Sequence, residues 1–221
     1  MAQTPFEQKA PYKDSYSIFL FASNNRGNKG DAGRTRIYGC KIWEDDKLIR
    51  NFVPVYRNNE FCMYETCYGQ YYTNKGTEAF NGVLSADAKD TFIDQDGISY
   101  QVLDYIEGSG TQYINTGFDD NNSNNLKIEA KFSMQEFSQY AGVFGNYVDE
   151  PYSCWRLLLT NTDSSNGNYW VTTNRRAGGS TPVTIPKNTI NDVIISKDKI
   201  VINNVLTPLT NFNDGIVATT P

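Results

Sequence analysis

The sequence contains no histidine among its 221 residues. This absence excludes Ser-His-Asp and Cys-His nucleophilic sites in their ordinary forms, His-ligated zinc, and the usual general base near neutral pH. Carboxylates remain, but the acidic clusters at 44–46, 119–120 and 149–150 all fall at predicted turns, where solvated acids are common. We therefore expect no enzymatic activity.

Long apolar runs and clusters of basic residues are also missing. No stretch approaches the roughly 20 apolar residues that span a bilayer, so we expect no membrane insertion. Residues 1–8 lack the charged and apolar regions of a secretory signal, so we expect no signal peptide. A net charge of -5 with a pI near 4.8 disfavours a phosphate-binding surface, and we expect no nucleic-acid partner.

Cysteine is scarce, and the spacing of Cys40, Cys62, Cys67 and Cys154 matches no compact disulfide framework. The pair Cys62 and Cys67 lacks the second CxxC pair of a zinc ribbon. We expect free thiols that are buried as small apolar groups.

Tyrosine, phenylalanine, asparagine and glycine are abundant, with 15 Tyr and 12 Phe, which favours short strands joined by tight turns. Residues 126–134 alternate between apolar and polar side chains, as a half-buried strand does. Similar runs occur at 16–22, 35–43, 61–68, 140–145, 154–160, 169–173, 193–196 and 199–203. Apolar spacing typical of long helices is absent, so the sequence predicts an all-β sandwich.

Two sets of motifs stand in an unexpected order. Residues 105–117 read YIEGSGTQYINTG, and the segments 18–25, 36–43, 48–54 and 72–80 form a second set that precedes it. Together they resemble the concanavalin A-like, laminin G-like jelly rolls of phage structural proteins and gut-bacterial surface proteins. In that family a stretch like 105–117 opens the domain, and the second set closes it.

This resemblance implies an all-β, two-sheet antiparallel jelly-roll sandwich in circularly permuted order. We expect a single domain over 1–221, with a C-terminal-type half at 1–82, a joining segment at 83–104 and an N-terminal-type half at 105–221. The permutation predicts that the two halves interleave in one sandwich. It also places strands near 18–21 beside strands near 200–203.

The resemblance further implies a non-enzymatic phage virion component: a capsid-attached fibre or decoration protein, or a tail-fibre module, with host-surface glycan attachment. Its partners would be other virion proteins or copies of itself, and its location the virion or another extracellular setting. The alternative is a carbohydrate-binding module of a bacterial cell-surface protein. Glycoside hydrolases of the superfamily carry Glu-x-Asp-x-x-Glu or a close variant, which this sequence lacks.

Sugar binding needs aromatic faces together with amides and charges, and the segment 140–176 is rich in both. Trp155 and Arg156 cannot both face inward from one strand, and Trp155 is the better core residue. Core packing is the competing explanation for the aromatic residues of this segment. The candidate glycan-binding residues are Tyr140, Tyr147, Arg156, Trp170, Asn174 and Arg175.

Calcium is a weaker expectation, and no other cofactor is expected. Asp119 and Asp120 offer loop carboxylates of the kind that calcium prefers, although such acids are also ordinary turn residues. Arg34 and Arg36 are expected to pair with nearby carboxylates and not with a ligand.

Overall fold

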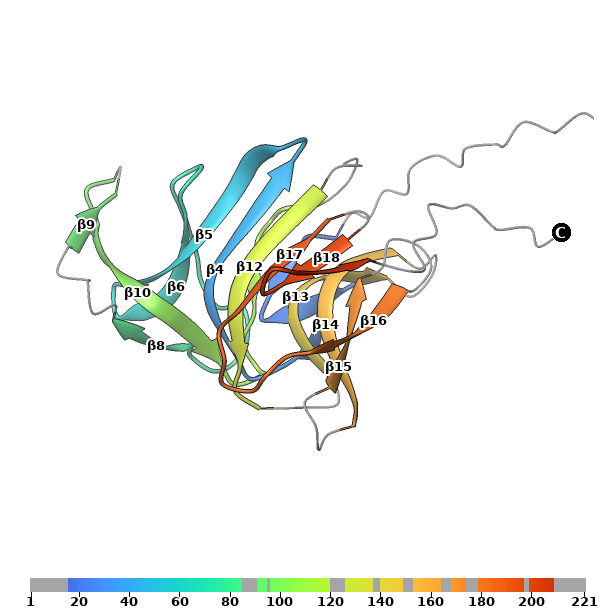
Figure 1. Ribbon diagram of the computed structural model, residues 1–221. Helices are drawn as coiled ribbons and strands as arrows, with labels where there is room; N and C mark the ends of the chain where they lie inside the picture. Colours follow the sequence, from blue (N-terminus) through green and yellow to red (C-terminus); the bar gives the residue numbers. More distant parts are fainter. Residues whose placement is uncertain are drawn as a thin grey trace, which may run out of the picture.

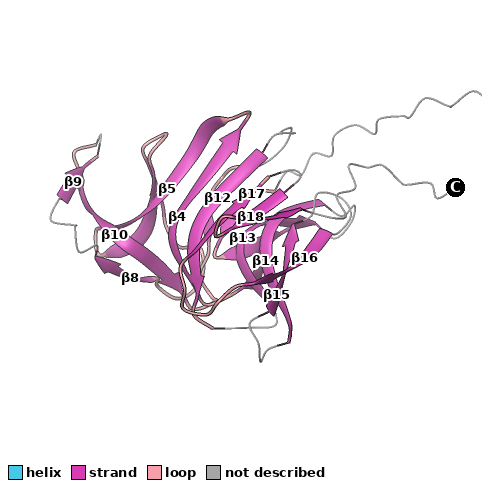
Figure 2. Cartoon of the chain, in the orientation of Figure 1, coloured by secondary structure: helices cyan, strands magenta, loops and turns pink. Residues whose placement is uncertain are grey.

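The computed structural model describes residues 16–84, 91–94, 96–119, 126–136, 140–148, 153–163, 168–173, 179–196 and 199–208. These residues form strands and turns, without helices, in two sheets (Figure 1, Figure 2). None of them lies in a helix that is long and apolar enough to cross a membrane. The predicted all-β, two-sheet sandwich is thus confirmed at this level.

The first sheet, sheet A, has eight strands. Its strand order is β11 (Ile114–Asn115), β1 (Phe19–Leu20), β13 (Tyr140–Val148), β14 (Ser153–Asp163), β15 (Asn168–Thr173) and β16 (Gly179–Thr184). A short hairpin of β2 (Ala22–Asn25) and β3 (Asn28–Ala32) joins this sheet where β2 pairs in parallel with β13.

The second sheet, sheet B, has eleven strands. Its strand order is β19 (Val205–Pro208), β18 (Lys199–Ile202), β17 (Asn191–Ile195), β12 (Leu126–Met134), β4 (Thr35–Glu44), β10 (Ser99–Gly108), β5 (Lys47–Arg57), β6 (Glu60–Glu65) and β7 (Gln70–Tyr72). Two further short strands, β8 (Asn81–Leu84) and β9 (Thr91–Ile93), pair with β10.

Strand β12 has the bounds that the alternating pattern predicts. Its apolar positions Leu126, Ile128 and Phe132 are buried, because they face sheet A across the core, whereas Lys127 and Glu129 are only half-buried on the opposite face. Polar turn residues end the strands elsewhere. The acids of the β4–β5 turn and the asparagines of the β18–β19 turn take positive φ, as tight hairpin turns require: Asp45 48°, Asp46 60°, Asn203 50° and Asn204 66°.

The β4–β5 hairpin closes at its tip and diverges towards its base. Residues 40–44 of β4 pair with residues 47–52 of β5, and β10 then pairs with both strands. The predicted joining segment 83–104 therefore contributes the end of β8, all of β9 and six of the ten residues of β10, and β10 lies between β4 and β5 in sheet B.

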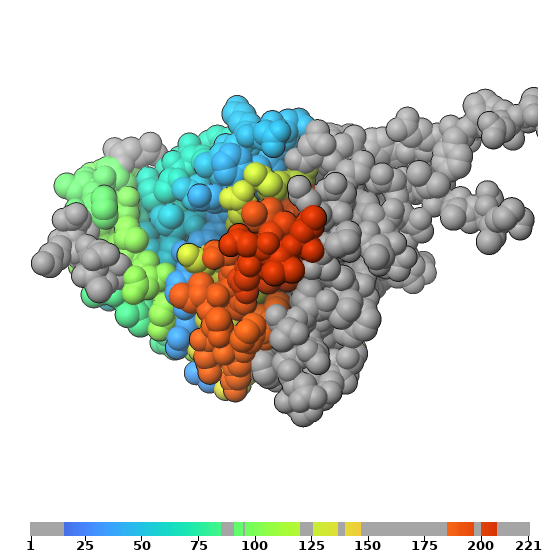
Figure 3. Space-filling view, viewed as in Figure 1, coloured from blue at the N-terminus to red at the C-terminus, as the bar shows by residue number. Residues whose placement is uncertain are grey.

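Strands from the two predicted halves share both sheets. In sheet B, β4 of the first half pairs with β12 of the second along nearly its whole length, and in sheet A β1 pairs with β11 and β13. Figure 3 shows one consequence: residues of β17 and β18, in orange and red, lie on the same face as blue residues of the first half. The core is one cluster with members from both halves, among them Ile18, Leu20, Ile37, Phe52, Ile128, Phe132, Phe144 and Ile200.

One adjacency that the permutation predicts is wrong. Strand β1 lies in sheet A, between β11 and β13, whereas β18 lies in sheet B, between β17 and β19. The two strands contribute to the same core but do not lie side by side in one sheet. A permutation requires that the rejoined ends of the domain lie close together. It does not determine which of the two sheets the strand next to each end joins.

The two recognised motif sets meet directly. The backbone N–H of Lys75 donates to the carbonyl of Tyr113 at 2.9 Å, and the Ser109 hydroxyl donates to the Glu78 carboxylate at 2.6 Å. The Gln112 side chain donates to the carbonyl of Ala79 at 2.9 Å. The polar residues of the 105–117 motif therefore join that segment to residues 74–80.

Candidate functional site

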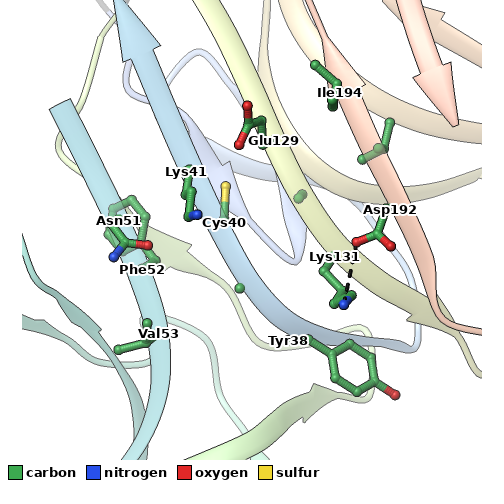
Figure 4. Close-up of a pocket in the computed structure, with 13 residues that line it drawn as sticks. Tyr38, Cys40, Lys41, Asn51, Phe52, Val53, Glu129, Lys131, Asp192 and Ile194 are labelled. Atoms are coloured by element: carbon green, nitrogen blue, oxygen red, sulfur yellow. Dashed lines mark ion pairs between the residues drawn. The ribbon is translucent and has the colours of Figure 1, made fainter. Parts of the chain in front are cut away.

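A hollow of about 430 Å³ lies on the outer face of sheet B, the face that points away from sheet A. Four strands build it: β5, β4, β12 and β17 (Figure 4). Its lining residues are Tyr38, Gly39, Cys40, Lys41, Asn51, Phe52, Val53, Glu129, Ala130, Lys131, Asp192, Val193 and Ile194.

Strand register places the polar side chains of the hollow in neighbouring rows. Glu129 stands opposite Lys41 on β4, and Lys41 stands opposite Asn51 on β5. In the next row, Lys131 stands opposite Asp192 on β17 and Gly39 on β4. Because Gly39 has no side chain, its position adds no side-chain atoms to the hollow at the centre of that row.

Charges in the hollow balance one another. Its lining includes two lysines, Lys41 and Lys131, and two acids, Glu129 and Asp192. The Lys131 ammonium lies 3.7 Å from an Asp192 carboxylate oxygen, and both side chains are at least half exposed, so this ion pair is weak. The surface therefore offers donors and acceptors close together without a net charge.

The thiol of Cys40 is not a nucleophile here. Cys40 lies on the inner face of β4, and burial raises the pKa of its thiol to about 12. Since only the thiolate attacks or binds metal, the Cys40 thiol stays neutral and inert. Within the described residues, Cys40, Cys62 and Cys67 are free, as expected. The expected burial is confirmed for Cys40 and Cys62 and is wrong for Cys67, which is exposed because it lies in the turn after β6.

Tyr38 brings an aromatic ring to the lower rim of the hollow (Figure 4). Its ring centroid lies 5.4 Å from that of Tyr105, and the guanidinium of Arg36 covers the Tyr105 ring at 4.5 Å. Arg36 in turn bonds the Glu107 carboxylate at 2.7 Å, and Arg34 bonds the same group at 3.0 Å. Both arginines thus pair with carboxylates, as the sequence predicts, and they hold the rim in place.

A second hollow, of about 320 Å³, opens between the edge strand β7 and β11. The Tyr71 hydroxyl, on its lining, is already bound to Asp94 at 2.8 Å. Lys75 is the one charged residue of its lining. It offers fewer polar groups for recognition than the hollow on sheet B.

The glycan-binding residues that the sequence predicts lie mostly on the other sheet. Tyr140, on β13, is 49% exposed. Tyr147, Arg156 and Trp170 occupy backbone positions in β13, β14 and β15, and Thr160 pairs with both Tyr140 and Trp170. Asn174 and Arg175 lie outside the described residues, so a glycan surface on sheet A stays a prediction.

The calcium site also stays a prediction. Asp119 is half-buried just after Phe118, and Asp120 lies outside the described residues. Within the described part of the chain, no three or more Cys, Asp and Glu side chains gather in a way that could hold a metal ion.

Sequence reasoning missed the hollow because its polar residues come from four separate strands. One signal was present: the polar face of 126–134 contains both Glu129 and Lys131. Their neighbours Lys41, Asn51 and Asp192 stand between 61 and 90 residues away along the chain, and only the pairing of the strands brings them together.

Comparisons with protein-family models, curated proteins and solved structures gave no match for this chain.

Proposed function

We propose that this chain is a non-enzymatic phage virion component, a fibre, decoration or tail-fibre module, that binds a host-surface glycan in the hollow on sheet B. The fold within this proposal is a circularly permuted, concanavalin A-like jelly roll. Support for the fold comes from the docking of the 105–117 motif on residues 74–80 and from strands of both halves in each sheet.

The observation that carries the proposal is the polar lining of the sheet B hollow. Lys41, Asn51 and Glu129 form one row of donor, amide and acceptor, which suits the hydroxyl groups of a neutral sugar. A phosphate or another strong anion would instead meet two carboxylates. The volume of about 430 Å³ lies within the range of small-molecule sites, roughly 300–1,000 Å³.

Lysines beside the two acids of the hollow argue against hydrolysis. Glu129 is bonded by Lys127 at 3.0 Å and Asp192 lies near Lys131, with 68% of the Asp192 side chain exposed. Glycoside hydrolysis requires two carboxyl groups that flank the bond to be broken, and here each acid is already paired with a lysine. We expect the bound glycan to be recovered intact after prolonged incubation.

A glycan array followed by titration calorimetry tests the proposal. Replacing Lys41 with alanine removes a charged donor, whose hydrogen bond to a ligand is worth about 1.5–3 kcal/mol, so we expect affinity to fall at least tenfold. Lys47→Ala, at the exposed β4–β5 turn, is the matched control and should bind as the wild type does. Equal affinity of Lys41→Ala and Lys47→Ala would rule out the hollow as the binding site.

The virion assignment needs its own test, because a carbohydrate-binding module of a bacterial surface protein would use the same hollow. Mass spectrometry of purified particles should find the chain at a fixed ratio to the major capsid protein. If particles lack it while the purified chain still binds glycan, the bacterial surface module is the better assignment.

A further inference from the structure

Trp43 stands beside the hollow on the outer face of sheet B, beneath a lysine. It pairs with Lys127 in the row next to that of Lys41 and Glu129. The Lys127 ammonium lies 4.4 Å from the centre of the Trp43 ring and 3.0 Å from a Glu129 carboxylate oxygen. Lys127 therefore connects the indole ring to an acid that lines the hollow.

Trp43 also has an unsatisfied polar group. Its indole N–H is buried yet has no hydrogen-bond partner among the residues that the structure describes. Buried donors normally have a partner, and leaving one without any is unfavourable. A ligand hydroxyl that reached this N–H would remove that cost.

Lys127 is held over the ring by weak interactions. Its side chain and that of Glu129 are 32% and 28% exposed, and a partly exposed ion pair of this kind contributes little to stability. The contact between the Lys127 ammonium and the half-buried Trp43 ring adds one cation–π attraction, of about 0.5–2 kcal/mol. Moving Lys127 aside would break these two interactions and uncover the part of the Trp43 ring that its ammonium covers.

We propose that Trp43 is a stacking subsite for the glycan and that Lys127 is its displaceable cover. This inference rests on the proposed binding of a glycan in the sheet B hollow. A sugar hydroxyl donates to the Glu129 carboxylate in place of Lys127, the lysine side chain leaves the ring, and the apolar C–H face of a neighbouring sugar stacks on Trp43. The ligand is then a chain of at least two sugars, one over Lys41 and one over Trp43.

Titration calorimetry with the strongest glycan from the array tests this, using four proteins: wild type, Lys127→Ala, Trp43→Leu and the double variant. Removing the competing cation should tighten binding about two- to fivefold, and losing the ring should weaken it about two- to tenfold. In the Trp43→Leu background, Lys127→Ala should tighten binding by clearly less than in the wild type, because only the Glu129 carboxylate and no aromatic face is then uncovered. If Lys127→Ala tightens binding equally in both backgrounds, the gain comes from the freed Glu129 carboxylate and the stacking subsite is refuted.

A fluorescence titration avoids dependence on a variant that folds poorly. The wild type should change its tryptophan emission on glycan binding, and Trp43→Phe, which keeps an aromatic ring, should lose most of that change while still binding. An unchanged response in Trp43→Phe would overturn the inference. Failure of the proposed function looks different, because Lys41→Ala would then bind as well as the wild type.

Discussion

Replacing Gly76 with alanine would place a Cβ atom 2.0 Å from the carbonyl oxygen of Thr111 and 2.8 Å from the Cα of Gln112. Both contacts are with backbone, which cannot rotate away as a side chain can. Real Cβ atoms do not approach other heavy atoms closer than about 3.0 Å. Segments 74–80 and 108–113 would therefore have to separate by about 1 Å to bring the new Cβ atom to this distance from the Thr111 carbonyl oxygen. The hydrogen bonds that join these segments would lengthen with them.

We expect Gly76→Ala to lower the free energy of unfolding by about 3 kcal/mol, the upper part of the range for overpacked sites. Gly39→Ala is the matched control, because its Cβ would lie 3.5 Å from its nearest neighbour. That variant should be unchanged or more stable by up to about 1 kcal/mol, since alanine restricts the unfolded chain. Urea denaturation followed by fluorescence and circular dichroism measures both. A Gly76→Ala protein as stable as Gly39→Ala would refute the docking of the two motif sets.

Three further predictions concern stability and reactivity. Glu65→Ala should destabilise the protein by about 1–3 kcal/mol for each donor left unpaired, because the buried carboxylate accepts three backbone N–H groups. Urea denaturation measures this change, and a decrease of less than about 1 kcal/mol in the free energy of unfolding would contradict the prediction. A thiol reagent added to the native protein should modify Cys67 well before Cys40 or Cys62, whose thiol pKa values burial raises to about 12. Peptide mass mapping gives the order of modification, and the reverse order would contradict the prediction. Burial alone would raise the pKa of Asp94, but hydrogen bonds and a nearby arginine outweigh burial and lower it. This carboxylate should therefore stabilise the fold above about pH 4 and lose its effect as pH falls through its lowered pKa. Asp94→Asn should flatten that part of the pH–stability curve, and parallel curves for the wild type and the variant would contradict this.

Local patterns predicted much of the fold. Strand β12 follows from its alternation, and the turn at 45–46 follows from acids that tolerate positive φ. These features depend on residues that are neighbours along the chain, so they can be predicted from a single sequence. The placement of β1 in sheet A and of β18 in sheet B could not be predicted in the same way, because the sheet that a short apolar strand joins depends on the packing of the whole sandwich.

The candidate site was harder to predict for a related reason. The sequence pattern favoured the segment 140–176, where tyrosine and tryptophan are concentrated along the chain. The hollow depends instead on the register of four strands, which brings Lys41, Asn51 and Glu129 into one row. Composition identifies local concentrations of side chains, whereas a site that crosses a sheet requires the pairing of the strands.

NMR can locate the bound glycan on the protein and so decide between the sheet B hollow and sheet A. Backbone amide shifts of the labelled protein would be followed during titration with the strongest glycan from the array. The largest changes should fall on sheet B, at Gly39, Lys41, Glu129 and Asp192, with little change along β13. Changes concentrated around Tyr140 on sheet A, with the sheet B hollow unaffected, would contradict this prediction.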